Sequence, residues 1–225
     1  GIKAFEDLAN EKNIALIEDA AQGLGSWYPD GRHIGRAGVV GSFSFSAPKI
    51  ISTGQGGCLI TDCDVTASKI RRLKDFGRSE GGNDIHESIG FNFKFTELQA
   101  VIGIEQMKKL AARVIRKKQI FSRYQAGLSG IAGITAFQND ISLTAPWFID
   151  VIAERREQLI SFLKEKGIGS RVMYPPLNKQ KAYNLEGSHP VSERVGELGL
   201  WLPSMVQLKD DQIDRVCEEI RLFYK

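Results

Sequence analysis

The most constraining feature of this chain is a short apolar run, "IALI", that ends at two acidic residues. The run covers residues 14–17, and Glu18 and Asp19 follow it directly. Before it, apolar side chains recur at helical spacing and predict a helix over 1–12. An apolar run without alternation predicts a strand, here over 14–19, that is buried on both faces as in a parallel sheet. This order is typical of the interior of an α/β unit, and we expect earlier strands of that unit to lie outside the chain.

Further short elements are predicted in the first half of the chain. Two strands are expected at 39–45 and 57–61, each rich in apolar side chains. A helix is expected over 65–75, with Asp64 as its N-terminal cap and Gly77 at its end. Strands and helices therefore alternate, as an α/β fold requires.

The second half begins with a long helix and then changes character. Residues 77–95 are rich in glycine and lack periodicity, which predicts a loop. Thr96 and Gln99 then form a capping box, which predicts one helix that runs to about Gly127. Beyond it we expect a strand at 147–152, a helix at 154–166, a strand at 169–174 and a helix at 210–223. These elements indicate a smaller α+β domain, with the boundary near residue 113 inside the long helix.

Composition excludes several classes of function. An apolar fraction of 42% and a charged fraction of 25% are those of an ordinary globular protein. The net charge of +3 is too small to indicate a nucleic acid or a membrane surface as partner, and no apolar run approaches membrane-spanning length. Cys58, Cys63 and Cys217 have no metal-ligand spacing and cannot all pair. We therefore expect no metal site and a reducing, cytoplasmic location.

One lysine stands in surroundings that do not suit a solvated cation. Lys49 lies in the stretch "FSFSAPKIISTGQGG", and no other charged residue occurs between Arg36 and Asp62. In apolar, glycine-lined surroundings the pKa of a lysine falls, and the neutral amine is a nucleophile toward carbonyls. The alternative is a lysine that reaches water from the end of a strand.

Two further features are expected near the same strand ends. Asp19 follows a buried strand, and in open parallel sheets ligands bind beyond the carboxyl ends of strands. The alternative is that Asp19 only caps the next turn. Ser44 begins a segment of hydroxyl and glycine residues that can donate to a phosphate, although such loops are commonly just turns. An amine, a carboxylate and phosphate donors together suit pyridoxal phosphate.

Longer stretches carry a specific resemblance. The series E-D-A-A-Q, S-F-S-A-P-K and T-G-Q-G-G, within residues 18–57, and the segment "GFNFKFTELQA" resemble the DegT/DnrJ/EryC1/StrS sugar aminotransferases. The similarity extends over essentially the whole chain and is closest to the perosamine synthases. It implies the fold-type I architecture of pyridoxal-phosphate-dependent transferases, which is α/β. Residues 1–113 would be the C-terminal part of the cofactor-binding large domain, and 114–225 the small C-terminal α+β domain.

The resemblance also implies a reaction. Glutamate would give its amino group to a nucleotide-linked keto-deoxysugar, most simply a 4-keto-6-deoxyhexose used for polysaccharide biosynthesis. Pyridoxal 5'-phosphate would carry the amino group between the two substrates. The enzyme would be a homodimer whose subunits share their active sites, with no nucleic acid and no membrane as partner.

Residue by residue, the resemblance implies a cofactor pocket. Lys49 would form the Schiff base and move protons, and Asp19 would pair with the pyridinium nitrogen. Gln22, one helical turn beyond Asp19, would lie near the phenolic oxygen of the ring. Ser44 would bind the cofactor phosphate. Asn92 would reach the phosphate of the neighbouring subunit's cofactor, the alternative being a turn residue that binds its own backbone.

Lys94 and Tyr174 are the substrate-binding candidates. Lys94 would hold a carboxylate or a sugar phosphate, or else be a solvated loop lysine. Tyr174, in "VMYPPLN", would face the substrate, or else only pack. Two positions depart from the family. Gln55 replaces a glutamate, which should change little because the glycines set the geometry of the turn, and Asn178 replaces a histidine that many members carry.

Two other functions stay open. Some relatives are sugar dehydratases with histidine in place of the lysine, and Lys49 argues against that reading. A non-catalytic fragment or binding protein that keeps the fold is the other alternative. Members of the family begin upstream with a turn that completes the phosphate site and an aromatic residue that stacks on the ring. We expect this chain to hold only part of the pocket.

Overall fold

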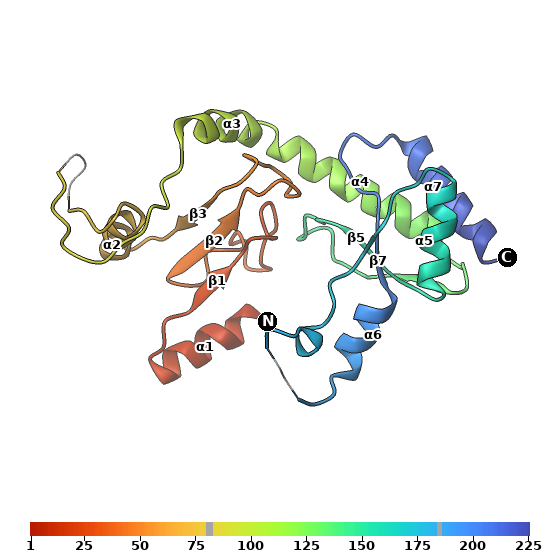
Figure 1. The fold of residues 1–225 in the computed structure, drawn as a ribbon, viewed down its shortest axis with the longest axis horizontal. Helices are drawn as coiled ribbons and strands as arrows, with labels where there is room; N and C mark the ends of the chain where they lie inside the picture. Colours follow the sequence, from red (N-terminus) through yellow and green to blue (C-terminus); the bar gives the residue numbers. More distant parts are fainter. Residues whose placement is uncertain (80–82, 184–185) are drawn as a thin grey trace. The chain divides into compact units, whose positions relative to one another are not determined.

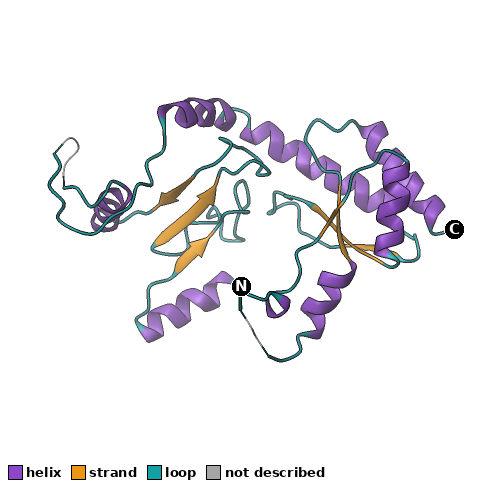
Figure 2. Ribbon diagram, in the orientation of Figure 1, coloured by secondary structure: helices purple, strands orange, loops and turns teal. Residues whose placement is uncertain are grey.

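The computed structural model describes residues 1–79, 83–183 and 186–225. They form two compact units, of which the first contains Gly1–Val114 with Ser142–Ala145 and the second Ile115–Ile141 with Pro146–Lys225. Figure 1 shows the order of helices and strands along the chain, and Figure 2 distinguishes helices from strands by colour. The division falls within one helix. The roles of 1–113 as a cofactor-binding domain and of 114–225 as a small domain stay predictions.

The first unit contains a three-stranded sheet in the order β1, β2, β3. Its strands are β1 (Ile17–Asp19), β2 (Val40–Ser44) and β3 (Gly57–Ile60), and helices α1 (Ile2–Lys12), α2 (Asp64–Lys74) and α3 (Glu97–Met107) belong to the same unit. β1 runs parallel to β2, whereas β3 runs antiparallel to β2. The sheet is therefore mixed. The α/β class expected from the sequence is confirmed.

β1 is less buried than its apolar run predicted. Of its three residues only Glu18 is buried, and Ile14 and Ile17 are 64% and 67% exposed. The expectation of a strand buried on both faces is therefore wrong for this chain. The reason is its place in the sheet, because β1 is an edge strand whose neighbour is β2. In addition, the helix α1 that precedes it has no buried residue.

The helix α2 starts one residue earlier than predicted. Its N-cap is Cys63, so Asp64 is the first helical residue and not the cap. Gly77 follows the end of the helix with a positive φ of 79°. The loop predicted over 77–95 is confirmed where the structure describes it, because strand pairing there is limited to isolated bridges. Residues 80–82 of that loop lie outside the described residues.

The predicted long helix consists of two helices. The capping box is confirmed, with Gln99 N–H donating to Thr96 Oγ1 and Thr96 N–H donating to Gln99 Oε1. Two residues then separate α3 from α4 (Leu110–Leu128). At this break Lys109 N–H donates to Gln106 O, a short-range bond that tightens the turn. Neither glycine nor proline marks the break, and the sequence therefore carried no signal for it.

The second unit contains an antiparallel sheet in the order β4, β5, β7, β6. Its strands are β4 (Ile134–Ala136), β5 (Ile149–Ala153), β6 (Arg171–Val172) and β7 (Gly199–Leu202). Its helices are α5 (Arg156–Glu165), the short 3-10 helix η1 (Leu177–Lys179), α6 (Pro190–Leu198) and α7 (Asp210–Phe223). Most of α4 also belongs to this unit.

The sequence predicted β5, α5, β6 and α7 but not β4, α6 or β7. β7 pairs with both β5 and β6, and all four of its residues are buried. Its "GLWL" run is consistent with a buried strand, but a run this short cannot be told from a buried helix segment by periodicity alone. α6 starts at Pro190, a residue that favours the first helical position.

The hydrophobic core cluster lies in the second unit. Alternate residues of β5 face α4, α5 and α7, and the members that are completely buried are Ile120, Tyr124, Val151, Ala153, Leu159, Leu163, Leu200, Ile213 and Ile220. Burial of each large aliphatic side chain contributes about 1.5–3 kcal/mol to folding.

In the described part of the chain, no helix has the length and apolar character needed to cross a membrane.

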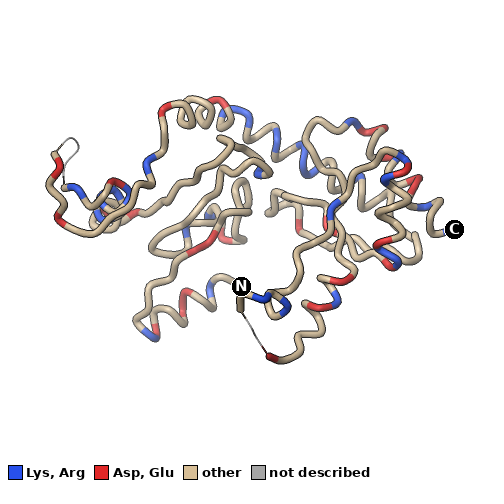
Figure 3. Tube along the Cα trace, in the orientation of Figure 1, with Lys and Arg blue, Asp and Glu red and all other residues tan. Residues whose placement is uncertain are grey.

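A charged side chain lies within this unit. Figure 3 shows basic positions along α4, and among these Lys117 is buried, with 5% of its surface exposed. Its ammonium donates to the carbonyl oxygens of Trp147 and Ser204, the latter at 2.8 Å. Burial lowers the pKa of Lys117 to about 8, although the charge of Asp150 acts in the opposite direction. Folding therefore weakens proton binding at this amine.

This pKa difference predicts a dependence of stability on pH. Between about pH 8 and the ordinary pKa of 10.5 the unfolded chain binds more protons at Lys117 than the folded chain, so stability rises with pH in that window. The free energy of unfolding of the wild type should rise relative to that of Lys117→Met, by at most about 1.4 kcal/mol per pH unit. Urea unfolding at several pH values measures this difference. Lys164→Met, at an exposed position, should follow the wild type, and parallel curves for Lys117→Met would contradict the prediction.

Candidate functional site

The carboxyl ends of β1 and β2 meet at one edge of the first sheet. The strands are parallel with Asp19 opposite Ser42, and Ala20 N–H donates to Ser42 O at 2.9 Å. β2 ends two residues later, at Ser44. β3 runs antiparallel to β2 and pairs Gly57 with Ser44. The loop that connects β2 to β3 therefore starts and ends at this same edge. Three chain segments therefore converge where ligands of open α/β sheets bind.

Asp19 and Lys49 come together at this edge. Lys49 follows β2 in a turn in which its N–H donates to Ser46 O at 3.1 Å. The lysine is half-buried, and Asp19 lies close enough for its charge to act on the amine. Burial lowers the pKa of Lys49, and the charge of Asp19 offsets part of this effect. The amine is therefore easier to deprotonate than an exposed lysine, as the sequence predicted.

Asp19 also caps the turn that follows β1. Its Oδ1 accepts the N–H of Ala21 at 3.0 Å, which is the local role weighed as an alternative. This bond uses one carboxylate oxygen, and the residue is exposed. A carboxylate can accept at both oxygens, so the cap does not exclude a second role.

Ser44 forms a pair of hydroxyls with Ser46. Ser44 Oγ donates to Ser46 Oγ at 3.2 Å and accepts the N–H of Ser46 at 3.3 Å. The hydroxyls of Ser52 and Thr53 instead donate to the backbone oxygens of Phe45 and Gln55. The hydroxyl donors that can serve a phosphate at this edge are thus those of Ser44, at the end of β2, and Ser46, while the later hydroxyls stabilise the loop itself.

The T-G-Q-G-G loop is held through its backbone. Gln55 O accepts from Thr53 Oγ1 at 2.7 Å and from Gln99 Nε2 at 2.8 Å, so the capping residue of α3 also fixes this loop. Gly54 and Gly56 have φ values of 81° and 138°, which residues with a side chain rarely adopt. A Cβ at Gly56 would also lie 2.4 Å from the ring of Phe95. The contacts do not use the side chain of Gln55, which agrees with the small effect expected of that substitution.

The buried member of the acidic pair is Glu18, to which the sequence analysis assigned no role of its own. Its carboxylate is 8% exposed and accepts the N–H of Gly35, the N–H of Ala37 at 2.9 Å and the hydroxyl of Tyr28. Burial, and then the bond to Glu18, raise the pKa of Tyr28. One carboxylate thus organises the loop between β1 and β2. Strand alternation could have indicated the burial of Glu18: neighbouring residues of a strand point to opposite faces, so Glu18 and Asp19 cannot both face the same side of the sheet.

Gln22 was expected one helical turn beyond Asp19, and this geometry is wrong. The chain forms a tight turn here, in which Gly23 N–H donates to Ala20 O at 2.9 Å, and Gln22 is exposed. The cause is the Asp19 cap, which turns the backbone directly after the strand. Its place near the phenolic oxygen of a cofactor stays a prediction.

Asn92 and Lys94 gather at the end of α2. The backbone of Asn92 pairs with that of Asp75, and its side chain is exposed. Lys94 Nζ donates to Asp75 Oδ1 at 2.9 Å and lies 3.9 Å from the centre of the Phe76 ring. Hydrogen bonds from Arg78 and Lys94 lower the pKa of Asp75 to about 2. Lys94 therefore has a protein partner in this chain.

Tyr174 belongs to an aromatic cluster of the second unit. Its ring stands edge-on to Trp201, with 4.9 Å between ring centres, and Trp201 stacks on Phe148 at 4.4 Å. The guanidinium of Arg171 lies 5.5 Å from the centres of both the Tyr174 and Trp201 rings. Packing is thus one role of Tyr174, and 58% of its surface remains exposed.

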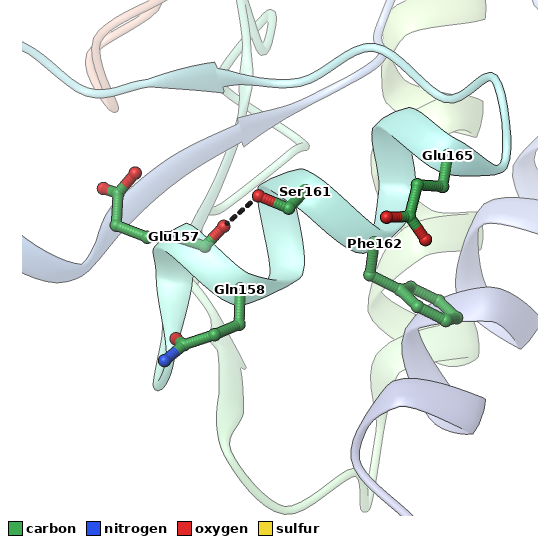
Figure 4. A pocket seen from close by; sticks show the side chains of 5 residues that line it. All are labelled: Glu157, Gln158, Ser161, Phe162 and Glu165. Atoms are coloured by element: carbon green, nitrogen blue, oxygen red, sulfur yellow. Dashed lines mark hydrogen bonds between the residues drawn. The ribbon is translucent and has the colours of Figure 1, made fainter.

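A pocket on α5 is shown in Figure 4. It has a volume of about 410 Å³ and is lined by Glu157, Gln158, Ser161, Phe162 and Glu165. Ser161 Oγ donates to Glu157 O at 3.0 Å, a bond within the helix. The lining contains none of the predicted site residues, and the pocket therefore carries no part of the functional argument.

At this edge of the α/β sheet a half-buried lysine lies beside an aspartate, and a lysine whose pKa is lowered can react with carbonyl compounds. The model of the DegT/DnrJ/EryC1/StrS aminotransferase family matches residues 1–221, so the chain belongs to this family. Pyridoxal phosphate is the cofactor of the family. The resemblance and the family cofactor predicted from the sequence are thereby confirmed.

Individual relatives agree with this assignment. The GDP-perosamine synthase of Escherichia coli O157:H7 is 30% identical over 97% of this chain and 60% of its own length. The aminotransferase TlmJ from Streptoalloteichus hindustanus is 31% identical, with a TM-score of 0.88 over 97% of this chain and 61% of that one. A family member from Brucella abortus is 26% identical, with a TM-score of 0.91 over 100% of this chain and 61% of that one. The chain thus spans about 60% of the length of these relatives.

The role of Glu18 predicts a cost for neutralising it. In Glu18→Gln one acceptor oxygen becomes an NH2 donor that faces backbone N–H groups and the Tyr28 hydroxyl. Leaving such a group unpaired in the interior costs about 1–3 kcal/mol. The free energy of unfolding in urea should fall by this amount. Glu11→Gln, on the exposed surface of α1, should change it by less than about 0.5 kcal/mol, and equal values for both variants would contradict the prediction.

Proposed function

We propose that this chain is part of a pyridoxal-phosphate-dependent aminotransferase that moves an amino group from glutamate to a nucleotide-linked keto-deoxysugar, most simply a 4-keto-6-deoxyhexose. The observation that carries the proposal is the half-buried Lys49, with its lowered pKa, beside Asp19 at the carboxyl edge of the sheet. The family and the sugar aminotransferases among its relatives support the reaction class. The free thiols Cys58, Cys63 and Cys217 support a reducing, cytoplasmic location.

The side chains at the sheet edge fit this cofactor. An amine that is easily deprotonated suits its aldehyde, a carboxylate suits its ring nitrogen, and the Ser44–Ser46 hydroxyl pair suits its phosphate. Bound pyridoxal phosphate would supply an electron sink for the carbanion formed when a proton leaves the substrate. Gln22 would lie near the ring, and Asn92 would serve the site of a second subunit in a homodimer.

Lys49 would hold the cofactor and move the proton. Its neutral Nζ would accept a proton from the α-carbon of the amino donor, and partial burial makes the neutral form of this amine more accessible than that of an exposed lysine. The turn after β2 fixes the backbone of Lys49 through Ser46 O. A flexible four-carbon side chain on a fixed backbone can deliver the proton to one carbon and return it at another.

Asp19 would keep the ring nitrogen protonated. It stays in place because its Oδ1 is held by the N–H of Ala21 at the end of β1. Lys94 and Tyr174 would contact the substrate, Lys94 by its charge and Tyr174 by its exposed ring. A lysine at position 49 opposes the sugar dehydratase alternative, whose members have histidine there. The remaining alternative is a chain that keeps the fold without catalysis.

A covalent label tests the assignment of Lys49. After incubation with pyridoxal phosphate and reduction with borohydride, peptide mapping should find the cofactor on Lys49, because its neutral amine attacks the aldehyde. Lys49→Ala should lose the label, whereas Lys69→Ala, at an exposed position of α2, should keep it. A label spread over exposed lysines would overturn the assignment and favour the non-catalytic reading.

The variant Asp19→Asn tests the role of the negative charge of Asp19 apart from the hydrogen bond by which this residue caps the turn. The amide oxygen can still accept from Ala21, so folding should be unchanged, while loss of the negative charge should lower the pKa of Lys49 further. Transamination should fall by at least about 100-fold, because the ring nitrogen loses its charged partner. The pH dependence of Lys49 acetylation and the turnover rate measure the two effects. Asp62→Asn is the exposed control, and an unchanged turnover rate would place the pyridinium partner elsewhere.

A further inference from the structure

The turn over residues 46–49, which ends at Lys49, is adjoined by a hydrogen bond from a distant part of the chain. On its N-terminal side the turn is closed by the bond from Lys49 N–H to Ser46 O. On its C-terminal side Arg113 Nη1 donates to Ile50 O at 2.9 Å, across 63 positions of sequence. Ile51, the next residue, is 2% exposed. The backbone is therefore held immediately before and immediately after the lysine.

Arg113 is itself fixed by a second acceptor. The same nitrogen donates to Gln106 Oε1 at 2.6 Å, and the side chain of Arg113 is half-buried. Gln106 lies in α3 and Arg113 in α4, so the short break between the helices separates the two partners. A guanidinium is planar and stays charged at all working pH values. Its grip on Ile50 O therefore does not change with pH.

From this geometry we infer that Arg113 is a positioning residue for Lys49, one that holds the turn so that the amine stays at the sheet edge beside Asp19. The inference rests on the proposed role of Lys49. It does not require contact between Arg113 and a ligand. A reacting amine displaced by about 1 Å can lose about 100-fold in rate, which is why a flexible lysine needs a fixed backbone.

Loss of the bond from Arg113 to Ile50 O would also change the pKa of the Lys49 amine. Partial burial lowers the pKa of Lys49. When Ile50 O is released, the turn can relax and the amine becomes better hydrated. Its pKa then moves up toward the ordinary lysine value. Removal of a nearby positive charge would also raise this pKa, and a useful test must distinguish the two causes.

Competitive acetylation measures the pKa of Lys49 without any cofactor. The folded chain is acetylated over a series of pH values, and mass spectrometry of the Lys49 peptide gives the midpoint. Arg113→Gln should raise this midpoint by about 0.5–1 pH unit. Lys109→Gln removes the same charge from an exposed position just before α4 and should leave the midpoint unchanged.

Arg113→Lys decides between position and charge. It keeps the positive charge, but its ammonium ends one bond short of Nη1 and cannot span to Ile50 O and Gln106 Oε1 as the guanidinium does. We expect a midpoint raised nearly as far as in Arg113→Gln. If Arg113→Lys instead has the wild-type midpoint, the charge of Arg113 alone sets the pKa of Lys49 and the inference is overturned. If Arg113→Gln does not fold, Arg113→Lys alone provides the test.

Attachment of pyridoxal phosphate supplies the second measurement. The rate at which borohydride-fixed label accumulates on Lys49 should fall about tenfold in both Arg113 variants. If no variant, including the wild type, takes up label while the acetylation midpoints still shift, the proposed function fails but the action of Arg113 on Lys49 holds. If label accumulates at the wild-type rate in both variants, Arg113 does not position Lys49 for the cofactor.

Discussion

The first unit depends on the hydrogen bonds that the carboxylate of Glu18 accepts. This carboxylate accepts two backbone N–H groups and the Tyr28 hydroxyl, and in this way it draws the loop between β1 and β2 onto the strand. The approach is so close that a Cβ at Gly41 would lie 2.0 Å from Gly35 O, a contact that only glycine permits. With this loop in place, the carboxyl ends of β1 and β2 stay open, and Asp19 is left at the edge.

The site at that edge is built mainly from backbone contacts and not from side-chain packing. Gln99 ties the start of α3 to the loop before β3, and Arg113 ties the start of α4 to the turn after β2. Backbone oxygens held in this way cannot shift without breaking a hydrogen bond, and the half-buried Lys49 gains a fixed origin for its long side chain. The lowered pKa of that lysine is a consequence of this partial burial. The chemistry proposed for the family cofactor needs such an amine.

The two units are stabilised in different ways. The second has an apolar core to which α4, α5 and α7 contribute together with β5 and β7. The buried ammonium of Lys117 is satisfied by two backbone carbonyl oxygens. In the first unit the buried residues include the apolar side chains of Phe43 and Ile51 and also the polar residues Ser26 and Thr53. There, satisfied hydrogen bonds take over much of the role that apolar packing has in the second unit.

Local patterns were sufficient for most elements and for the family. The capping box of α3, the final helix α7 and the lysine in its uncharged stretch were all readable because each depends on neighbouring residues. The break before α4 and the turn at Gln22 are closed by local hydrogen bonds. Tertiary structure alone decided the exposure of β1, since it depends on which segment lies alongside. The same holds for Glu18 and Arg113. Their partners are 10–19 and 63 positions away, and residue type carries no information about contacts over such distances.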